Sequence, residues 1–355
     1  GALIWEASAV TAAGSGYAVT LAGDAKISVS GTGSYAYAGT LGATSAGRAL
    51  TIDTGAALLQ STGGVTANIS QLTKVGNGTL SIASGANVAS SNVAVSAGSL
   101  INNGAVAGAV NVSSGATLGG TGTINGTVTL AGTGAAGQAG ALIWEASTQS
   151  GAGSAYAVTL AADSKISVNG TGSYTYAGAL GASTAGRSLT IDTGTALLQS
   201  TGGVTANISQ VTKLGSGTLS IASGASVASS NVAVSAGSLI NYGTVTGAVN
   251  VSSGATLGGT GTIAGTVTLA GTGAAGQAGA LVWEASAVAP VGSAYAVTLA
   301  ADAKISVNGT GSYTYAGALG ASTAGRSLTI DTGTAVLQST GGVTSNISQL
   351  TKVGN

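Results

Sequence analysis

The chain has 355 residues, of which only 5% are charged, and nine basic residues balance nine acidic ones. It contains no His and no Cys, so the most common general base, the thiol nucleophile and the usual zinc ligands are absent. The zero net charge argues against nucleic acid as a partner, because such binding leaves a basic footprint. We therefore expect no enzyme: no catalytic, cofactor-binding or metal-binding residues, and no cofactor.

The sequence is a tandem repeat with a long period. GALIWEAS begins at Gly1 and at Gly140, and GALVWEAS begins at Gly279. These positions define repeat 1 (residues 1–139), repeat 2 (140–278) and a partial repeat 3 (279–355). Long internal periods are typical of stacked-repeat proteins. We expect the repeats to form one continuous rod that is a segment of a longer array.

The part of the repeat that varies most is residues 9–16, which read AVTAAGSG, then TQSGAGSA, then AVAPVGSA. The only proline of the chain, Pro290, lies in the third copy. Proline removes a backbone donor from a strand. We therefore expect residues 9–16 and their copies to form a loop that leaves the fold.

The rest of the first half predicts strands by alternation. In residues 25–29 the pattern places Ile27 and Val29 inward, and Asp24 and Lys26 outward.

Two further segments of the first half fit the same pattern. Leu50 and Ile52 are expected to point inward. In residues 34–37 the replacement of Ala36 by threonine in the later repeats suggests that Ala36 faces out and that Tyr35 and Tyr37 face in.

Residues 78–139 carry a finer rhythm. Val88, Val106 and Ile124 recur at a constant spacing of 18, and Leu80, Leu100 and Leu118 recur at spacings of 20 and 18. Short apolar segments with alternating spacing, separated by Gly- and Asn-containing corners, predict three short strands per turn. The abundance of Gly and β-branched residues opposes helix.

These patterns predict an all-β fold, a right-handed parallel β-helix or β-solenoid. We expect about 18–20 residues and three short strands per coil, and thus about seven coils in each repeat. Stacking pairs the backbone of each coil with its neighbours, and inward positions form apolar ladders. Because Gly, Ser, Thr or Asn interrupts every apolar run before roughly 18 residues, we expect no membrane insertion.

Residues Leu72–Ile82, with the sequence LTKVGNGTLSI, resemble the LTKxGxGTLxL signature of autotransporter-associated β-strand repeats. Repeat 2 departs from it with Val211 in the first position. Residues 115–124 are similar to the closing coil of many passenger domains, and the resemblance covers residues 50–130 of each repeat. It implies a surface-exposed or secreted β-helix of a Gram-negative bacterium, delivered by type V secretion or a related route, in the style of giant repetitive adhesins or surface fibres.

The charged residues are confined to the first half of each repeat; those of repeat 1 are Glu6, Asp24, Lys26, Arg48, Asp53 and Lys74. Clustered carboxylates at glycosidase spacing would support sugar chemistry. The competing interpretation, which we favour, is that Asp24 pairs with Lys26 and that Asp53 pairs with Arg48 or Lys74 in surface ion pairs.

One tryptophan recurs in each repeat, as Trp5, Trp144 and Trp283. Each of them is suited either to stacking on a sugar or to packing in the core, and we expect core packing.

The neutral halves, residues 78–139 and 217–278, lack the charges that normally prevent lateral association. They fit either contact with other rods or simply a neutral surface suited to secretion. We expect an extracellular or cell-surface fibre or stalk of a bacterial surface protein, which acts in adhesion, matrix formation or filament assembly. Its expected partners are other copies, end to end or side by side, further repeats of the same chain, and host or matrix glycans. The alternatives are a carbohydrate-binding or carbohydrate-degrading β-helix and a phage tail-fibre shaft.

Overall fold

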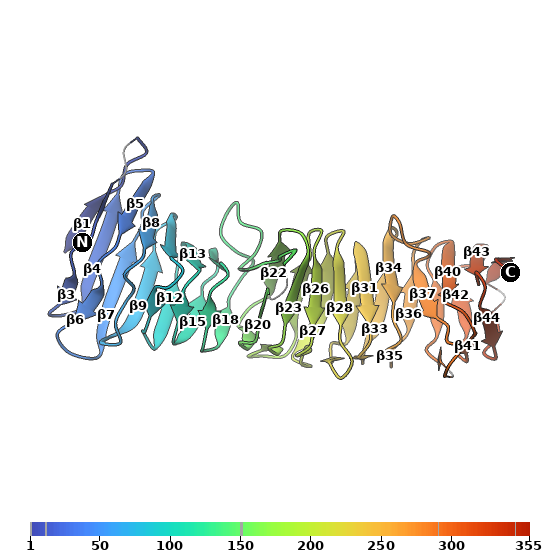
Figure 1. Ribbon diagram of the computed structural model, residues 1–355. Helices are drawn as coiled ribbons and strands as arrows, with labels where there is room; N and C mark the ends of the chain where they lie inside the picture. Colours follow the sequence, from blue (N-terminus) through green and yellow to red (C-terminus); the bar gives the residue numbers. More distant parts are fainter. Residues whose placement is uncertain (1, 11–12, 150–151, 290, 345) are drawn as a thin grey trace. The chain divides into compact units, whose positions relative to one another are not determined.

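The computed structural model describes residues 2–10, 13–149, 152–289, 291–344 and 346–355. Over these residues the regular structure consists of β-strands and no helix. Figure 1 shows the strands along the chain, which divides into two compact units. Compact unit 1 contains residues 1–145 and 154–167, and compact unit 2 contains residues 146–153 and 168–355.

The strands of compact unit 1 are β1 (Leu3–Glu6), β2 (Ala13–Ser15), β3 (Val19–Leu21), β4 (Ala25–Ser30), β5 (Ser34–Tyr37), β6 (Leu41–Ala43), β7 (Arg48–Asp53), β8 (Leu58–Ser61), β9 (Ile69–Val75), β10 (Thr79–Ile82), β11 (Asn87–Val88), β12 (Asn92–Val95), β13 (Gly98–Asn102), β14 (Ala105–Val106), β15 (Ala109–Val112), β16 (Ala116–Gly119), β17 (Thr123–Ile124), β18 (Val128–Leu130), β19 (Leu142–Glu145) and β21 (Val158–Leu160). Two strands include residues of both units, β20 (Gly153–Ser154) and β22 (Ser164–Asn169).

The strands of compact unit 2 are β23 (Ser173–Tyr176), β24 (Leu180–Ala182), β25 (Arg187–Asp192), β26 (Leu197–Ser200), β27 (Ile208–Leu214), β28 (Thr218–Ile221), β29 (Ser226–Val227), β30 (Asn231–Val234), β31 (Gly237–Asn241), β32 (Thr244–Val245), β33 (Ala248–Val251), β34 (Ala255–Gly258), β35 (Thr262–Ile263), β36 (Val267–Leu269), β37 (Leu281–Glu284), β38 (Gly292–Ser293), β39 (Val297–Leu299), β40 (Ala303–Asn308), β41 (Ser312–Tyr315), β42 (Leu319–Ala321), β43 (Arg326–Asp331), β44 (Val336–Ser339) and β45 (Ile347–Val353).

Each unit is a parallel β-solenoid with three strands per coil, which confirms the predicted fold class. The strands pair in parallel with strands two or three positions along the chain, so the backbone is hydrogen-bonded from coil to coil. One row of inward residues in compact unit 1 runs through Leu3, Ile27, Ile52, Lys74, Val95, Val112 and Leu130. The six aliphatic members of this row stabilise the core by stacking.

The in-and-out alternation also follows the prediction. Ile27, Val29, Leu50 and Ile52 are all buried, whereas Lys26 is exposed. Tyr35 and Tyr37 likewise point into the core and are 8% and 1% exposed, while Ala36 between them is exposed. Period-2 patterning was therefore sufficient to assign the faces of these strands.

Coil length changes within a repeat. Between positions 78 and 124 the sequence spacing of paired strands is close to 18, as in Asn87 with Ala105 and Gly98 with Ala116. The coils that precede position 75 are longer, because Ala25 pairs with Leu50 and Ser34 pairs with Leu58, at spacings of 25 and 24. The predicted coil length of 18–20 residues is confirmed for the second half of the repeat. Because the coils of the first half are longer, a repeat contains fewer than the seven coils that we expected.

A repeat ends one strand beyond a whole number of coils. In compact unit 1, the sheet that contains β1 reaches β18 after six coil steps. The strand of repeat 2 that is equivalent to β1 is not β18 but the next strand, β19. Strand β19 pairs with β16, which belongs to a different sheet. Compact unit 2 shows the same shift, because β45 lies in the sheet of β28 and not in that of its equivalent, β27. A feature that occurs once per repeat therefore moves to the next side of the coil.

The variable segment is only partly a loop. Ala13–Ser15 forms the short strand β2, which pairs with β5 through Ala13 and Tyr35. The expectation that all of residues 9–16 leave the fold is therefore wrong for its second half, because the backbone groups of β2 find partners on the next coil. Pro290, with residues 11–12 and 150–151, lies outside the described residues.

Candidate functional site

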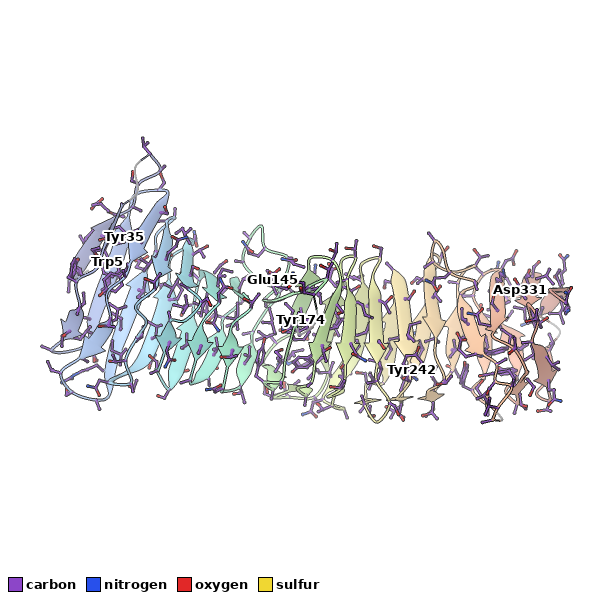
Figure 2. All side chains as sticks on the ribbon, in the orientation of Figure 1. Trp5, Tyr35, Glu145, Tyr174, Tyr242 and Asp331 are labelled. Atoms are coloured by element: carbon purple, nitrogen blue, oxygen red, sulfur yellow. The ribbon has the colours of Figure 1, made fainter. Side chains whose placement is uncertain are left out.

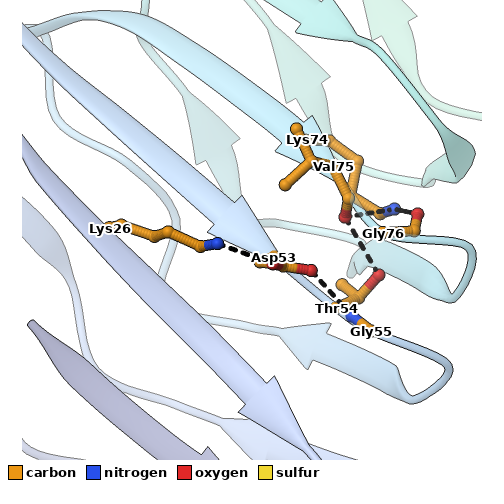
Figure 3. A network of polar contacts seen from close by, with 7 residues as sticks. All are labelled: Lys26, Asp53, Thr54, Gly55, Lys74, Val75 and Gly76. Atoms are coloured by element: carbon orange, nitrogen blue, oxygen red, sulfur yellow. Dashed lines mark hydrogen bonds and ion pairs between the residues drawn. The ribbon is translucent and has the colours of Figure 1, made fainter. Parts of the chain in front are cut away.

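Two of the charged residues of repeat 1, Lys26 and Asp53, meet at the end of β7. Asp53 is the last residue of this strand, and its carboxylate Oδ2 lies 2.7 Å from the Nζ of Lys26 on β4 (Figure 3). Its Oδ1 accepts a hydrogen bond from the backbone N–H of Gly55 at 3.0 Å, which closes the turn after the strand. The hydrogen bond from Lys26, together with that from Gly55, lowers the pKa of Asp53. The same ion pair recurs in repeat 3 between Lys304 and Asp331 at 2.9 Å.

Lys74 lies in the core and not on the surface. It occupies an inward position of β9, between Ile52 and Val95, and its exposed fraction is 0%. Its Nζ donates hydrogen bonds to three backbone carbonyls, those of Val75 at 3.0 Å, Gly76 at 2.7 Å and Ala97 at 3.0 Å. Figure 3 shows the first two of these bonds.

Burial lowers the pKa of Lys74 to about 8, against the opposite and smaller effect of the Asp53 carboxylate. The predicted surface ion pair of Asp53 with Lys74 is therefore wrong, because Lys26 holds the carboxylate and the backbone holds Lys74.

Repeat 2 reproduces this arrangement. Lys213 is 0% exposed, and its Nζ donates to the carbonyls of Leu214, Gly215 and Ala236 at 2.8, 2.7 and 3.0 Å. Burial lowers its pKa to about 8 as well. In repeat 3 the equivalent residue is Lys352, which lies on the last strand of the chain, is exposed and bonds to the carbonyl of Gly354. The lysine is thus buried where a further coil covers it.

The other predicted ion pairs are replaced by one bond between coils and one bond within a turn. Asp24 accepts a hydrogen bond from the backbone N–H of Ala49 at 3.0 Å, and the Nε of Arg48 donates to the hydroxyl of Ser45 at 3.0 Å. Neither the predicted pair of Asp24 with Lys26 nor that of Asp53 with Arg48 is formed in the described structure. Both side chains instead satisfy nearby polar groups where β7 begins.

The structure does not bring the two aspartates together. The register pairs Asp53 with Ser28, and Asp24 lies four residues before Ser28 along the chain. At about 3.3 Å per residue this separation is about 13 Å, longer than the roughly 5–9.5 Å that glycosidase carboxylates require. Glu6 is exposed on β1. The described acids of repeat 1 therefore do not form a paired-carboxylate site.

Each tryptophan lies in an aromatic cluster of the core, as expected. Trp5 is 2% exposed and stacks on Tyr37 and Tyr35, with ring centroids 4.5 and 5.3 Å away. Its Nε1 donates to the hydroxyl of Tyr17 at 2.8 Å. Figure 2 shows Trp5 and Tyr35 on neighbouring coils. Burial raises the pKa of Tyr37, whose hydroxyl donates to backbone carbonyls.

Trp144 and Trp283 are each 1% exposed and donate to Tyr156 and Tyr295, both at 2.9 Å. No tryptophan offers an open face for a sugar.

Sequence reasoning missed the buried lysines, although a signal was present. Leu72 and Lys74 are two residues apart on one strand, so a buried Leu72 places Lys74 on the inward face as well. The charge of lysine led to its assignment to the surface, since lysine is rarely buried without partners. Here the turn residues after the strand provide those partners.

Within the described ranges there is no group of three or more acidic residues that could hold a metal ion. The same residues include no helix long and apolar enough to cross a membrane. Comparison of the chain with protein-family models, with curated proteins and with solved structures gave no match.

Proposed function

We propose that the chain is a structural segment of an extracellular fibre or stalk of a bacterial surface protein, in which the stacked coils bear load. The observation that carries this proposal is the coil-to-coil construction of each unit. Parallel backbone pairing and apolar ladders follow one another through the unit, and the charged groups of the site serve turns and ladder positions. This construction supports a mechanical role, and the resemblance of residues 72–82 to autotransporter repeats supports secretion to the cell surface.

The shift of one strand per repeat adds to the proposal. A side chain or loop that occurs once per repeat moves to a different sheet in the next repeat. An array of such repeats would present its contacts in several directions and not along a single stripe. That geometry suits a fibre that adheres to a matrix on all sides.

The experiment is to pull the chain by its two ends in an optical trap. We expect high resistance and release in steps of one coil, about 17–25 residues, which is about 60–85 Å at roughly 3.4 Å per residue. Extension at low force without steps would contradict a mechanical role. Immunogold microscopy of the producing cells tests the location, and label confined to the cell interior would refute it.

We propose that the partners include other copies, which contact the neutral surfaces of residues 78–139 and 217–278. These surfaces carry no charge to repel a second copy. Mass in solution should rise with protein concentration and should change little with salt. Lysines placed at the exposed positions Asn87 and Asn111 should abolish the rise, and an unchanged profile would exclude these surfaces.

A glycan-binding role is the second candidate from the sequence. The separation of Asp24 from Asp53 and the burial of the tryptophans do not favour it. A glycan array probed with the labelled chain decides between the two. Saturable binding to one class of glycan would support adhesion through sugars, and release of oligosaccharide would overturn the structural proposal.

A further inference from the structure

One apolar ladder of compact unit 2 stops at an uncovered strand. Its members are Leu180, Val204, Val227, Val245 and Ile263. The first four are at most 5% exposed, whereas Ile263 is partly exposed. Ile263 lies on β35, which pairs with β32 on one side only. The next strand at this side of the coil, β38, belongs to a separate sheet with β41 and β44.

A groove of about 720 Å³ lies at this interruption. Residues 260–264 line one wall, and residues 291–295 with Thr314 and Ala316 line the other. The lining consists of hydroxyl-bearing, glycine and small apolar residues with Tyr295, and includes no charged side chain.

The walls of the groove are strand edges. The N–H groups of Thr262 and Ala264 donate to the carbonyls of Gly243 and Val245, both at 2.9 Å, on the β32 side. Because successive peptide groups of a strand point in opposite directions, the N–H and C=O of Ile263 point into the groove. On the other wall the carbonyls of residues 291 and 293 accept bonds from the β41 side, so the peptide groups of residue 292 point into the groove as well.

The same edge recurs in compact unit 1. Ile124 on β17 ends the ladder of Val65, Val88 and Val106 and is also partly exposed. The N–H groups of the two flanking residues, 123 and 125, donate to the backbone carbonyls of Gly104 and Val106, both at 2.9 Å. The chain thus has two edges of one kind, one in each unit.

We propose that the groove between β35 and β38 binds an extended, neutral polypeptide segment of a partner protein, which adds to the edge of β35 as a parallel strand. Strand edges with free peptide groups are recognised by an extended main chain. The ladder that leads to Ile263 specifies a valine or isoleucine at the inward position of that segment. The stacked Thr244 and Thr262 specify small or hydroxyl-bearing neighbours. This proposal goes beyond the fibre function and does not depend on it.

The test uses the full chain and a fluorescent peptide with the sequence of residues 243–248, Gly-Thr-Val-Thr-Gly-Ala. We expect saturable binding by fluorescence anisotropy, at peptide concentrations up to the millimolar range. The double variant Ile124→Pro/Ile263→Pro removes the groove-facing N–H groups and leaves the internal hydrogen bonds in place, because the neighbouring N–H groups make those bonds. It should weaken binding at least tenfold and leave the thermal unfolding midpoint unchanged.

A second measurement keeps the proposal testable if the prolines disturb the fold. Amide hydrogen exchange of the wild-type chain should slow at Ile263 and Ile124 when the peptide is present, and should not change at Thr262. A control peptide with proline in place of valine should have no effect. Absence of binding by the first peptide, or binding that leaves both amides unprotected, would overturn the proposal.

Discussion

The Nζ of Lys74 donates a hydrogen bond to the backbone carbonyl of Ala97 at 3.0 Å, across the boundary between two coils. The same ammonium group bonds two carbonyls of its own turn, Val75 and Gly76. Lys74 therefore ties the end of β9 to the turn of the following coil from inside the core. A lysine at a ladder position is stable only because the turns supply carbonyl partners for all three of its protons.

Replacement of the two buried lysines by methionine should destabilise the protein. The variant Lys74→Met/Lys213→Met keeps the length of the side chain but leaves buried carbonyls without donors, and each site should lose about 1–3 kcal/mol of unfolding free energy. Denaturant unfolding at pH 7 measures the loss. The matched control is Lys352→Met at the exposed equivalent position, which should change the free energy by less than about 0.5 kcal/mol. Equal effects of the two variants would show that burial is not the cause.

Stability should rise with pH between about 8 and 9.5. The folded pKa of Lys74 and Lys213 is about 8, below the usual 10.5, so over this window the folded chain has lost protons that the unfolded chain still binds. The gain should be about 1–2 kcal/mol per lysine at pH 9.5, from about 1.4 kcal/mol per pKa unit. Unfolding curves at pH 7.5, 8.5 and 9.5 measure it. The double methionine variant should show a flat profile, and a slope that persists in it would assign the effect to other groups.

The tryptophans should report a dry and rigid environment. With exposed fractions of 1–2%, Trp5, Trp144 and Trp283 should emit at short wavelength and resist quenching by acrylamide. Trp283→Leu should lose about 2–4 kcal/mol, because it leaves a cavity and removes the hydrogen bond that the indole donates to the Tyr295 hydroxyl. The exposed Tyr242, labelled in Figure 2, provides the control: Tyr242→Leu should be nearly neutral. Strong quenching in the native protein would contradict the core assignment and reopen the sugar-stacking alternative.

Gly78 should be intolerant of a side chain. A Cβ on this residue would lie 2.1 Å from the carbonyl oxygen of Ala57 on the preceding coil. Gly78→Ala should therefore lose about 1–3 kcal/mol. At Gly23 a Cβ meets nothing within 4 Å, and Gly23→Ala should be neutral or stabilise by up to about 1 kcal/mol. Thermal unfolding of the two variants compares them, and similar midpoints would mean that the coils separate easily at this corner.

The alternation of residues in single strands was sufficient to predict much of the fold. Ile27 and Val29 point inward, and Val88, Val106 and Ile124 stack, as their spacing indicated. These predictions succeeded because the side-chain period of a strand is fixed at two and because a strand of a few residues must stack to bury its face. The inward positions of Tyr35 and Tyr37 were predicted from the replacement of Ala36 by threonine in the later repeats, and the core position of Trp5 from its large apolar ring.

The sequence by itself determined that this chain is a tandem parallel β-solenoid and where its charges occur. Only the tertiary structure decided which charges meet, because partners such as Lys26 and Asp53 depend on a register set by corner lengths that alternation does not encode. The same lengths decided that a repeat ends one strand beyond six coils, which moves β19 to a different sheet from β1. Lys74 shows the physical reason in one residue: its charge favours the surface, and the carbonyls that hold it in the core come together only when two coils stack.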